Sequence, residues 1–486
     1  MPMSQPRPSS RREFLKFAGL GSLVFGAGSA RALGADGREA SANSAKRQAK
    51  NVIFMVSDGM CFSVLTAAQT YLTRTEKRSS HWMKMYAERP VVRSLCETDS
   101  ASGIVTDSAA AASCWGIGER IDNGVLNITQ DGRKPVTLVQ KMNAAKKRCG
   151  LVTTATATHA TPAGFAVTVA KRSDQKAIAA QYLERGVDVV LGGGTQYFSD
   201  DLRAAYRKAG YGLALDRDQL LADAGQAPLL GLFSKSHIPF EIDRLNSADL
   251  KASTPTLAEM TKVSLRRLSS APEGFFLMVE GGRIDHAAHG NDGAAAIREQ
   301  VAFDEAIATV LAFVDKNPDT LLIVTTDHGT GGFNVNGLGN EDFVSTAPSY
   351  SESSPAFDRM TAFTSSLELL ATKTKGKAAK DFVGAAEQVT GLKFSAEDRA
   401  KITSTKTLSA ALMKYTSIGW TSNNHTGEMV EFCSSGPGSQ LFTPHLRNDQ
   451  VHAKILQATG VACGWFTRPT KLASLRTPFV VLGLSA

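Results

Sequence analysis

The chain has 486 residues, of which 43% are hydrophobic and 21% are charged, so its composition is that of an ordinary globular protein. Its formal net charge is +8, but the first 32 residues hold five basic residues and one acidic residue, which is half of that excess. No basic run with interleaved aromatic residues follows, so no nucleic-acid partner is expected. A chain of this length forms two or three domains or one large α/β core.

The N-terminal segment has the pattern of an export signal. Arg11 and Arg12 precede a Gly-rich apolar stretch over 17–30, and Ala30-Arg31-Ala32 offers a small-residue cleavage site. The pattern resembles a bacterial twin-arginine (Tat) signal, which implies export of a folded protein to the periplasm or beyond. No other segment reaches the ~18 apolar residues of a membrane span, so no stable membrane anchor is expected. We predict a signal peptide over 1–32, a linker over 33–50 and a catalytic domain over 51–486.

Apolar runs that alternate with amphipathic stretches predict the fold. In chain order the expected strands are 51–57, 91–95, 150–154, 187–191, 274–279 and 321–325, and the expected helices are 61–73, 106–115, 136–148, 174–185, 257–269, 292–315 and 447–459. Continuous apolar strands between helices indicate an α/β fold, with a large, mainly parallel central sheet covered by helices on both faces. Residues 333–420 are polar and rich in Ser and Lys, with helical pieces near 377–391 and 406–417. They predict an inserted crown or lid beside the sheet.

Polar residues capable of metal binding follow several of the expected strands. Asp58 follows the first strand, Glu280 ends the strand near 274–279, and Asp327 and His328 follow the strand at 321–325. Ligands of parallel sheets gather beyond the carboxyl ends of the strands. Adjacent residues of a strand face opposite sides of the sheet, so Asp327 and His328 can serve one site only if the strand ends before them. The glycines that follow permit such a break.

The stretch 279–289 adds two carboxylates and two imidazoles to this set. Asp285 and His289 are four residues apart, which on a helix places them on one face, where their oxygen and nitrogen atoms suit a divalent metal. Taken alone, this spacing is equally that of a solvated polar loop. His425, beside a turn, adds a further imidazole, although a single histidine there is more often structural.

A serine and an arginine supply the remaining chemistry. Ser108 opens an Ala-rich helix, where backbone N–H groups favour an anion, although Asp107 and Ser108 also fit a simple helix cap. A metal-activated serine there can attack phosphorus. Arg172 can hold two phosphate oxygens with its planar guanidinium, although a Lys-Arg pair is usually a solvated surface feature.

Together these motifs resemble the alkaline phosphatase family, in the family's order, from about 51 to 460. They are Asp58-Gly59-Met60, Thr106-Asp107-Ser108-Ala109-Ala110, His159-Ala160-Thr161-Pro162-Ala163, Glu280-Gly281-Gly282-Arg283-Ile284-Asp285-His286, Thr326-Asp327-His328-Gly329 and His425-Thr426-Gly427. The resemblance implies an exported homodimer that hydrolyses small phosphate monoesters.

The resemblance also implies the role of each site residue. Ser108 is the nucleophile that becomes phosphorylated, and Arg172 binds the phosphate. One zinc takes Asp285, His289 and His425; a second takes Asp58, Asp327 and His328; a magnesium takes Asp58, Thr161 and Glu280. His159 orients water of the third metal without binding the metal itself, and His286 lies near the phosphate and that metal. His81, His237, His445 and His452 match no motif and are interpreted as structural.

Some features depart from the family pattern or leave alternatives open. His159 and His286 stand where the best-known enterobacterial members have Asp and Lys, so the third metal and the pH optimum are open. Cys61 replaces a common glycine, and the six cysteines permit disulfides without requiring them. A phosphodiesterase of the same superfamily remains an alternative, whereas the nucleophile motif of sulfatases is absent around Ser108. A non-catalytic phosphate- or metal-binding periplasmic protein is a further alternative.

Overall fold

The computed structural model describes residues 48–225, 228–339 and 350–462. The predicted signal over 1–32, most of the linker over 33–50 and Cys463 lie outside these ranges. Within them, no helix combines the length and apolar character needed to cross a membrane.

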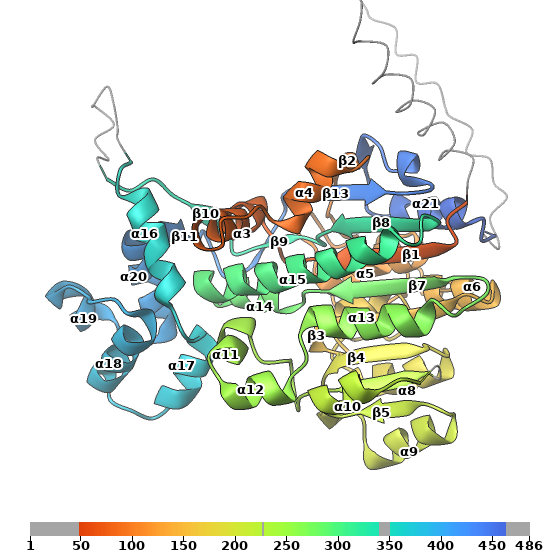
Figure 1. Ribbon diagram of the computed structural model, residues 1–486, viewed down its shortest axis with the longest axis horizontal. Coiled ribbons are helices and arrows are strands. Elements are labelled where there is room, and N and C mark those ends of the chain that lie inside the picture. Colours follow the sequence, from red (N-terminus) through yellow and green to blue (C-terminus); the bar gives the residue numbers. More distant parts are fainter. Residues whose placement is uncertain (1–47, 226–227, 340–349, 463–486) are drawn as a thin grey trace, which may run out of the picture.

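A ten-stranded sheet forms the centre of the molecule (Figure 1). Its strands, in spatial order, are β14 (His445–Leu446), β2 (Val92–Cys96), β13 (Val430–Ser435), β8 (Thr320–Thr325), β1 (Asn51–Val56), β7 (Phe275–Glu280), β3 (Arg148–Thr156), β4 (Val189–Gly193), β6 (Leu229–Leu232) and β5 (Gly212–Ala214). All neighbouring pairs are parallel except those that β13 makes with β2 and β8. The predicted α/β class with a mainly parallel sheet is confirmed.

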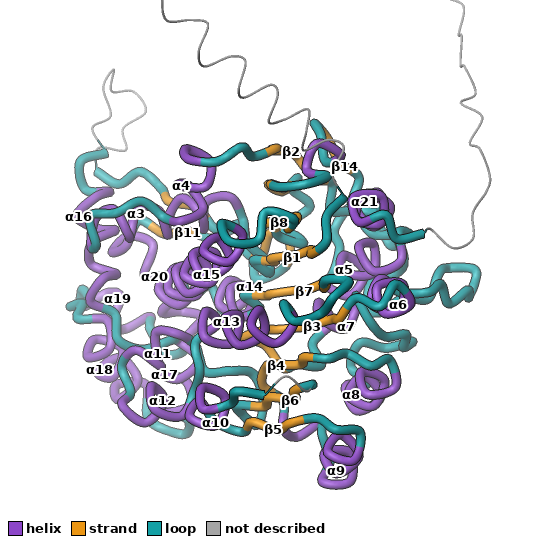
Figure 2. Tube along the Cα trace, turned by 45° about the vertical axis from the view of Figure 1, so that its right-hand side comes forward, coloured by secondary structure: helices purple, strands orange, loops and turns teal. Residues whose placement is uncertain are grey.

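Helices cover both faces of the sheet, as Figure 2 shows. One face carries α3 (Phe62–Thr75), α4 (His81–Glu88), α10 (Arg217–Ala222), α11 (Glu241–Leu245), α13 (Leu257–Leu268) and α15 (Gly293–Val314), and α12 (Ala248–Ser253) packs on α11. The other carries α5 (Ser108–Ile117), α6 (Leu138–Ala144), α7 (Ala160–Gly164), α8 (Gln175–Glu184), α9 (Asp200–Lys208) and α21 (Gln450–Thr459). Along β1, Ile53 packs into the first layer and Phe54 into the second, so side chains that alternate along the strands fill two cores.

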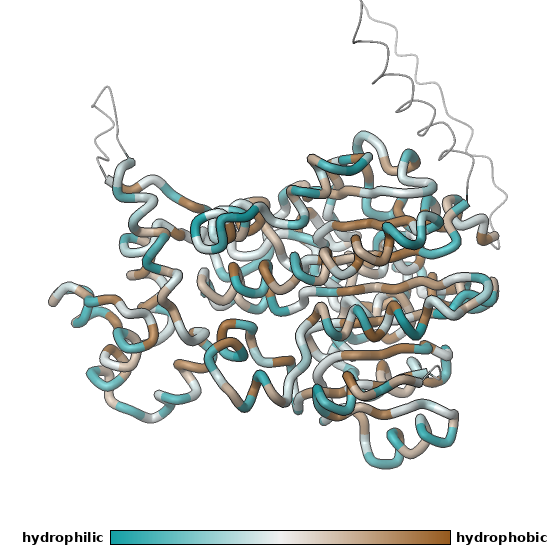
Figure 3. Tube along the Cα trace, in the orientation of Figure 1, coloured by the Kyte–Doolittle hydropathy of each residue, from teal (hydrophilic) through white to brown (hydrophobic). Residues whose placement is uncertain are grey.

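The central strands are apolar throughout because helices cover both of their faces. The strands at the middle of the sheet are strongly apolar along their length (Figure 3), and every residue of β1, β7 and β8 is buried. A strand with helices on both faces has no position where a polar side chain reaches water, so polar residues are displaced to its ends.

The segment predicted as an insertion packs beside the carboxyl ends of β7 and β8, next to α14 (Arg283–His289) (Figure 1). It comprises α16 (Ser353–Arg359), α17 (Leu367–Thr374), α18 (Ala379–Thr390), α19 (Ala396–Lys401) and α20 (Thr405–Thr416). Two short ribbons border it: β10 (Asn334–Val335) with β11 (Ile418–Gly419), and β9 (Gly329–Thr330) with β12 (His425–Thr426).

Candidate active site

The predicted site residues gather at the carboxyl edge of the sheet. Asp58 lies two residues beyond β1, Glu280 ends β7, and Asp327 and His328 lie in the break between β8 and β9. All four are at most 2% exposed. The strand break predicted from the glycines is therefore present, and it lets Asp327 and His328 both turn toward Asp58, as the distances below show.

Gly59 makes this close assembly possible. Its φ of +68° lies in the left-handed region, and a Cβ there would come within 2.6 Å of the side chain of Asp285. Its backbone N–H donates to Asp327 Oδ1 at 3.0 Å. A glycine is thus required for the chain after Asp58 to pass between two other site carboxylates.

Ser108 is the first residue of α5 and faces the same site. Asp107 caps the helix, because its carboxylate accepts from the backbone N–H of Ala110 at 2.9 Å. The hydroxyl oxygen of Ser108 lies 3.2 Å from Nε2 of His328, and the residue is 1% exposed. Both predicted roles of this motif are therefore compatible: Asp107 is the cap, and Ser108 is free to face the imidazole.

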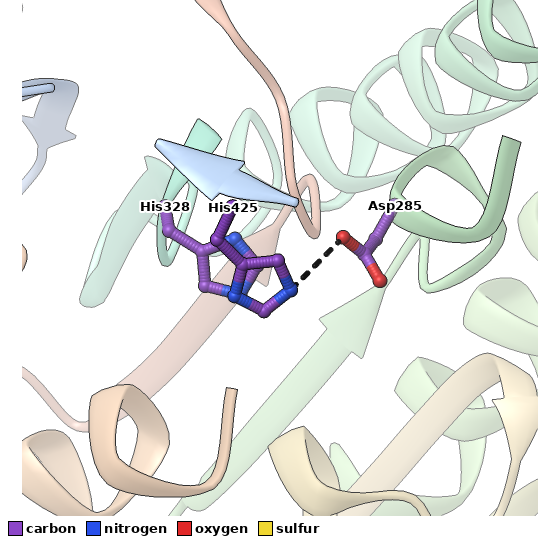
Figure 4. Close-up of side chains that lie close together, drawn as sticks. All are labelled: Asp285, His328 and His425. Carbon is purple, nitrogen blue, oxygen red and sulfur yellow. Dashed lines mark ion pairs between the residues drawn. The ribbon is translucent and has the colours of Figure 1, made fainter. Parts of the chain in front are cut away.

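Asp285, His289 and His425 form the first cluster of potential metal ligands. The predicted helical placement is present, because both Asp285 and His289 lie on α14, with His289 Nε2 3.4 Å from Asp285 Oδ2. His425, on β12, brings Nε2 to 3.6 Å from Asp285 Oδ1 (Figure 4). The same nitrogen lies 3.0 Å from His289 Nε2. The ring of His425 stacks on that of His328 at 3.7 Å, so His328 borders this cluster as well.

Backbone carbonyls orient both imidazoles of the first cluster. His289 Nδ1 donates to the carbonyl of Asn423 at 2.6 Å, and His425 Nδ1 donates to that of Thr106 at 2.7 Å. A carbonyl only accepts, so Nδ1 carries the proton in each ring and the Nε2 lone pairs face each other and Asp285. This is the orientation that metal-binding histidines have in proteins.

Asp58, Asp327 and His328 form the second cluster, beside Ser108. His328 Nε2 lies 3.1 Å from Asp327 Oδ2 and 3.9 Å from Asp58 Oδ1. One potential ligand atom from each of the three residues lies within 4.8 Å of the other two.

A third cluster joins Asp58 to Glu280 and His159. One ring nitrogen of His159 lies within 4.8 Å of carboxylate oxygens of Asp58 and Glu280. From its motif we expected His159 to act only through water, and in the structure its ring lies among the potential ligands. Thr161, on α7, is fully buried and its hydroxyl oxygen has no hydrogen-bond partner.

The unpartnered buried atoms show that these clusters fit divalent metals. Both carboxylate oxygens of Asp58 and of Glu280, Asp327 Oδ2, Thr161 Oγ1 and His159 Nδ1 are buried without a hydrogen-bond partner. Burial, together with the charges of Asp327 and Asp285, raises the pKa of Asp58 well above its usual range, and burial raises that of Glu280 to about 7. Such crowding of bare carboxylates is unfavourable unless cations neutralise it.

Arg172 reaches the site from the loop before α8. Its guanidinium donates to Asp107 Oδ2 at 3.0 Å and to Nε2 of His159 at 3.3 Å. The helix cap beside Ser108 thus also holds the arginine, so the predicted phosphate-binding group lies between the nucleophile and the third cluster.

Two further histidines stand beside the third cluster. The ring of His286 lies 5.3 Å from that of His159 and 4.3 Å from that of His237. His237, which the sequence analysis interpreted as structural, accepts from the backbone N–H of Thr156 at 3.1 Å. No motif marks His237, because the loop after β6 brings it to the site. Burial lowers the pKa of all three imidazoles, so they are neutral at physiological pH.

The described cysteines have structural surroundings. Cys61 is buried, its thiol donates to the carbonyl of Thr330 at 3.3 Å, and burial raises its pKa to about 11, which disfavours a reactive thiolate. The five described cysteines are all buried and unbridged.

Comparisons with known proteins agree with this geometry. A sequence model of the alkaline phosphatase family matches residues 49–461. Alkaline phosphatase 3 of Bacillus subtilis is 30% identical over 433 residues, which cover 86% of this chain and 92% of that protein. Among solved structures, the alkaline phosphatase of Thermus thermophilus superimposes with a TM-score of 0.79 at 32% identity, covering 86% of this chain and 93% of that one. The cold-active enzyme of a Shewanella species gives 0.72 at 30% identity, covering 84% and 99%.

The fold and the clustered carboxylates, imidazoles and serine define an α/β hydrolytic enzyme with the side chains for metal-assisted phosphoryl transfer. The chain belongs to the alkaline phosphatase family and is a phosphoric monoester hydrolase of that class.

Proposed function

We propose that this enzyme hydrolyses small phosphate monoesters through a phosphoserine intermediate on Ser108 and releases inorganic phosphate. The observation that carries the proposal is the position of the Ser108 hydroxyl. It stands at the N-terminus of α5, 3.2 Å from His328 Nε2 and beside carboxylates that have no partner. A hydroxyl so placed can lose its proton and attack phosphorus, while the backbone N–H groups of the helix favour the phosphate charge.

We infer two zinc ions and one magnesium ion as cofactors. Ligand sets that include imidazoles suit zinc, and the third set, which consists of oxygen donors, suits magnesium. The ligand sets are Asp285, His289 and His425 for the first zinc, Asp58, Asp327 and His328 for the second, and Asp58, Thr161 and Glu280 for magnesium. Bound there, the cations supply positive charge that stabilises the entering and leaving oxygens. His159 lies close to Asp58 and Glu280 and would suit zinc at the third position once Nδ1 loses the proton that the bond from Arg172 to Nε2 assigns to it.

The remaining side chains have distinct roles in the proposal. Arg172 binds two oxygens of the transferred phosphoryl group with its planar guanidinium, and Asp107 holds it in the required position. His159 and His286 line the phosphate on the side of the third cluster. A pure phosphate binder needs no serine nucleophile beside clustered potential metal ligands, so catalysis is favoured over binding alone.

We also propose that the chain is exported by the Tat pathway to the periplasm or beyond and acts there as a homodimer. The twin arginines at 11 and 12 support export. The family resemblance supports the dimer.

Replacement of the nucleophile tests the proposal. We expect Ser108→Ala to lose nearly all hydrolysis of an aryl phosphate monoester while its thermal unfolding and metal content stay close to wild type, because the small residue fits the first turn of a helix. Ser113→Ala, further along α5, is the matched control and should keep its activity. Full turnover by the Ser108 variant would refute the assignment. Faster cleavage of a diester than of the monoester by the wild type would favour a phosphodiesterase instead.

A further inference from the structure

A chain of polar contacts joins the insertion to the active site. On α17, Glu368 Oε1 accepts from Arg283 Nη2 at 2.8 Å. The same guanidinium, at the start of α14, contacts His286 Nδ1 through Nη1 at 3.1 Å. The insertion therefore reaches the imidazole beside the third cluster through one arginine.

The arginine determines the hydrogen-bond direction of His286. A guanidinium only donates, so Nδ1 of His286 must accept. A neutral imidazole that accepts at Nδ1 carries its proton on Nε2. Arg283 therefore sets both the orientation of the ring and the nitrogen that is left to donate in the site.

Arg283 depends on Glu368 for its charge balance. Its side chain is 3% exposed, its guanidinium lies 3.6 Å above the ring of Phe240, and Nε has no hydrogen-bond partner. Within the described ranges, Glu368 is the one carboxylate that forms an ion pair with it. A buried guanidinium held by a single carboxylate is sensitive to the loss of that carboxylate.

Glu368 is itself held by a firmly anchored helix. The two residues before it bind buried carboxylates: Ser366 donates to Asp243 from N at 2.8 Å and from Oγ at 2.6 Å, and Leu367 N donates to Asp292 at 2.6 Å. Exposed ion pairs usually contribute little because long side chains lose entropy on pairing. Here the backbone at the start of α17 is fixed, which lowers that cost.

We propose that Glu368, although it belongs to the insertion, is a positioning residue of the active site that acts through Arg283 to hold His286 as the Nε2-protonated donor. The effect on catalysis rests on the proposed phosphomonoesterase function, whereas the effect on His286 does not. The insertion thus completes the phosphate-binding side of the site.

Histidine-selective ¹⁵N labelling of the metal-loaded enzyme tests the effect on His286 directly. The signals of His286 are identified by their loss in His286→Gln. We expect the wild type to show Nε2 protonated and Nδ1 unprotonated, and Glu368→Gln to shift both signals toward the average of the two tautomers. Glu397→Gln is the matched control: it lies on α19 in the same insertion, is paired with Lys401, and has a side chain 71% exposed against 63% for Glu368. Signals of His286 in Glu368→Gln that superimpose on the wild type would overturn the proposal.

Steady-state kinetics test the consequence for phosphate. We expect Glu368→Gln to raise KM for an aryl phosphate and the inhibition constant of inorganic phosphate about fivefold, with kcat within about twofold, the change that one weakened hydrogen bond produces. Arg283→Lys should act in the same direction, because an ammonium cannot span both partners. Equal constants in Glu368→Gln and Glu397→Gln would overturn the role in phosphate binding. A wild type without monoesterase activity would refute the proposed function and leave the ¹⁵N result standing.

Discussion

At the residue scale, each ligand of the first cluster has one polar atom engaged by a neighbouring group of the protein. His289 and His425 each bind a backbone carbonyl through Nδ1, and Thr330 donates to Asp285 Oδ1 at 2.6 Å. Asn423 and Thr330 lie just outside the motifs, and Thr106 opens the motif that contains Ser108. These contacts leave one lone pair of each ligand aimed inward, so metal binding requires little rearrangement of side chains.

Gly59 gives a prediction at this scale. An alanine in the left-handed backbone conformation costs ~1–2 kcal/mol of folding free energy. Gly59→Ala should destabilise the enzyme by more than this, because the new Cβ also meets Asp285. Activity should fall with it, since Asp285 must move. Gly210→Ala is the control: its φ is +88° and nothing lies within 4 Å of its Cβ. Thermal unfolding and turnover of both variants are the measurements, and equal losses would contradict the steric argument.

Motif recognition identified the candidate ligands from Asp58 to His425, because each stands in a short pattern of fixed spacing, and the structure brings these residues together. It did not predict His237, whose only signal is the three-dimensional path of the loop after β6. It also could not give the distance from His159 to Asp58 and Glu280, because the distance between β3 and β7 cannot be read from either motif. The spacing of residues along the chain determines which side chains are neighbours within one motif. The distance between two motifs depends on how their strands are aligned in the sheet, which the sequence pattern does not give.

At the scale of elements, helix α15 carries a buried carboxylate outside the site. Glu299 is 3% exposed and accepts from the backbone N–H of Glu241 at 2.5 Å. Burial raises its pKa from 4.5 to about 8. The folded state therefore binds this proton more tightly than the unfolded chain does, and the resulting stabilisation is lost as the pH rises through about 8.

Glu299→Gln tests this linkage. The amide keeps the hydrogen-bond acceptor but is neutral at every pH. The unfolding temperature of this variant should therefore decline less than that of the wild type between about pH 5.5 and 9. Glu305→Gln, on the exposed side of the same helix, should decline as the wild type does. Parallel curves for Glu299→Gln and the wild type would show that the residue does not titrate in this interval.

Long apolar runs predicted the central strands and long helices within a few residues. Four strands of the ten-stranded sheet were not predicted: β5 and β14 are only three and two residues long, β6 is four, and β13 mixes apolar with polar residues. The antiparallel direction of β13 also could not be predicted, because a hydrophobic pattern carries no information about direction. Helix α14 has seven residues, too few for a clear period, and was inferred only from the spacing of Asp285 and His289.

At the scale of the whole molecule, the buried carboxylates couple metal binding to stability. We expect chelation to abolish monoester hydrolysis and to lower the unfolding temperature, because Asp58, Glu280 and Asp327 then face one another without counter-charge. Zinc with magnesium should restore both. The checks are calorimetry and turnover before and after dialysis against a chelator, and turnover that survives complete metal removal would contradict the metal roles.

The order in which the ligands occur along the chain has a consequence for biosynthesis. The second cluster is complete once residue 328 has folded, but the first needs His425, whose strand β12 pairs with β9 nearly a hundred residues earlier in the chain. The zinc proposed for the first position can therefore be bound with all three ligands only by a polypeptide that has been synthesised and folded beyond β12. Its occupancy would report that synthesis and folding have passed β12, and a chain truncated between β12 and α21 would still carry all the proposed ligands.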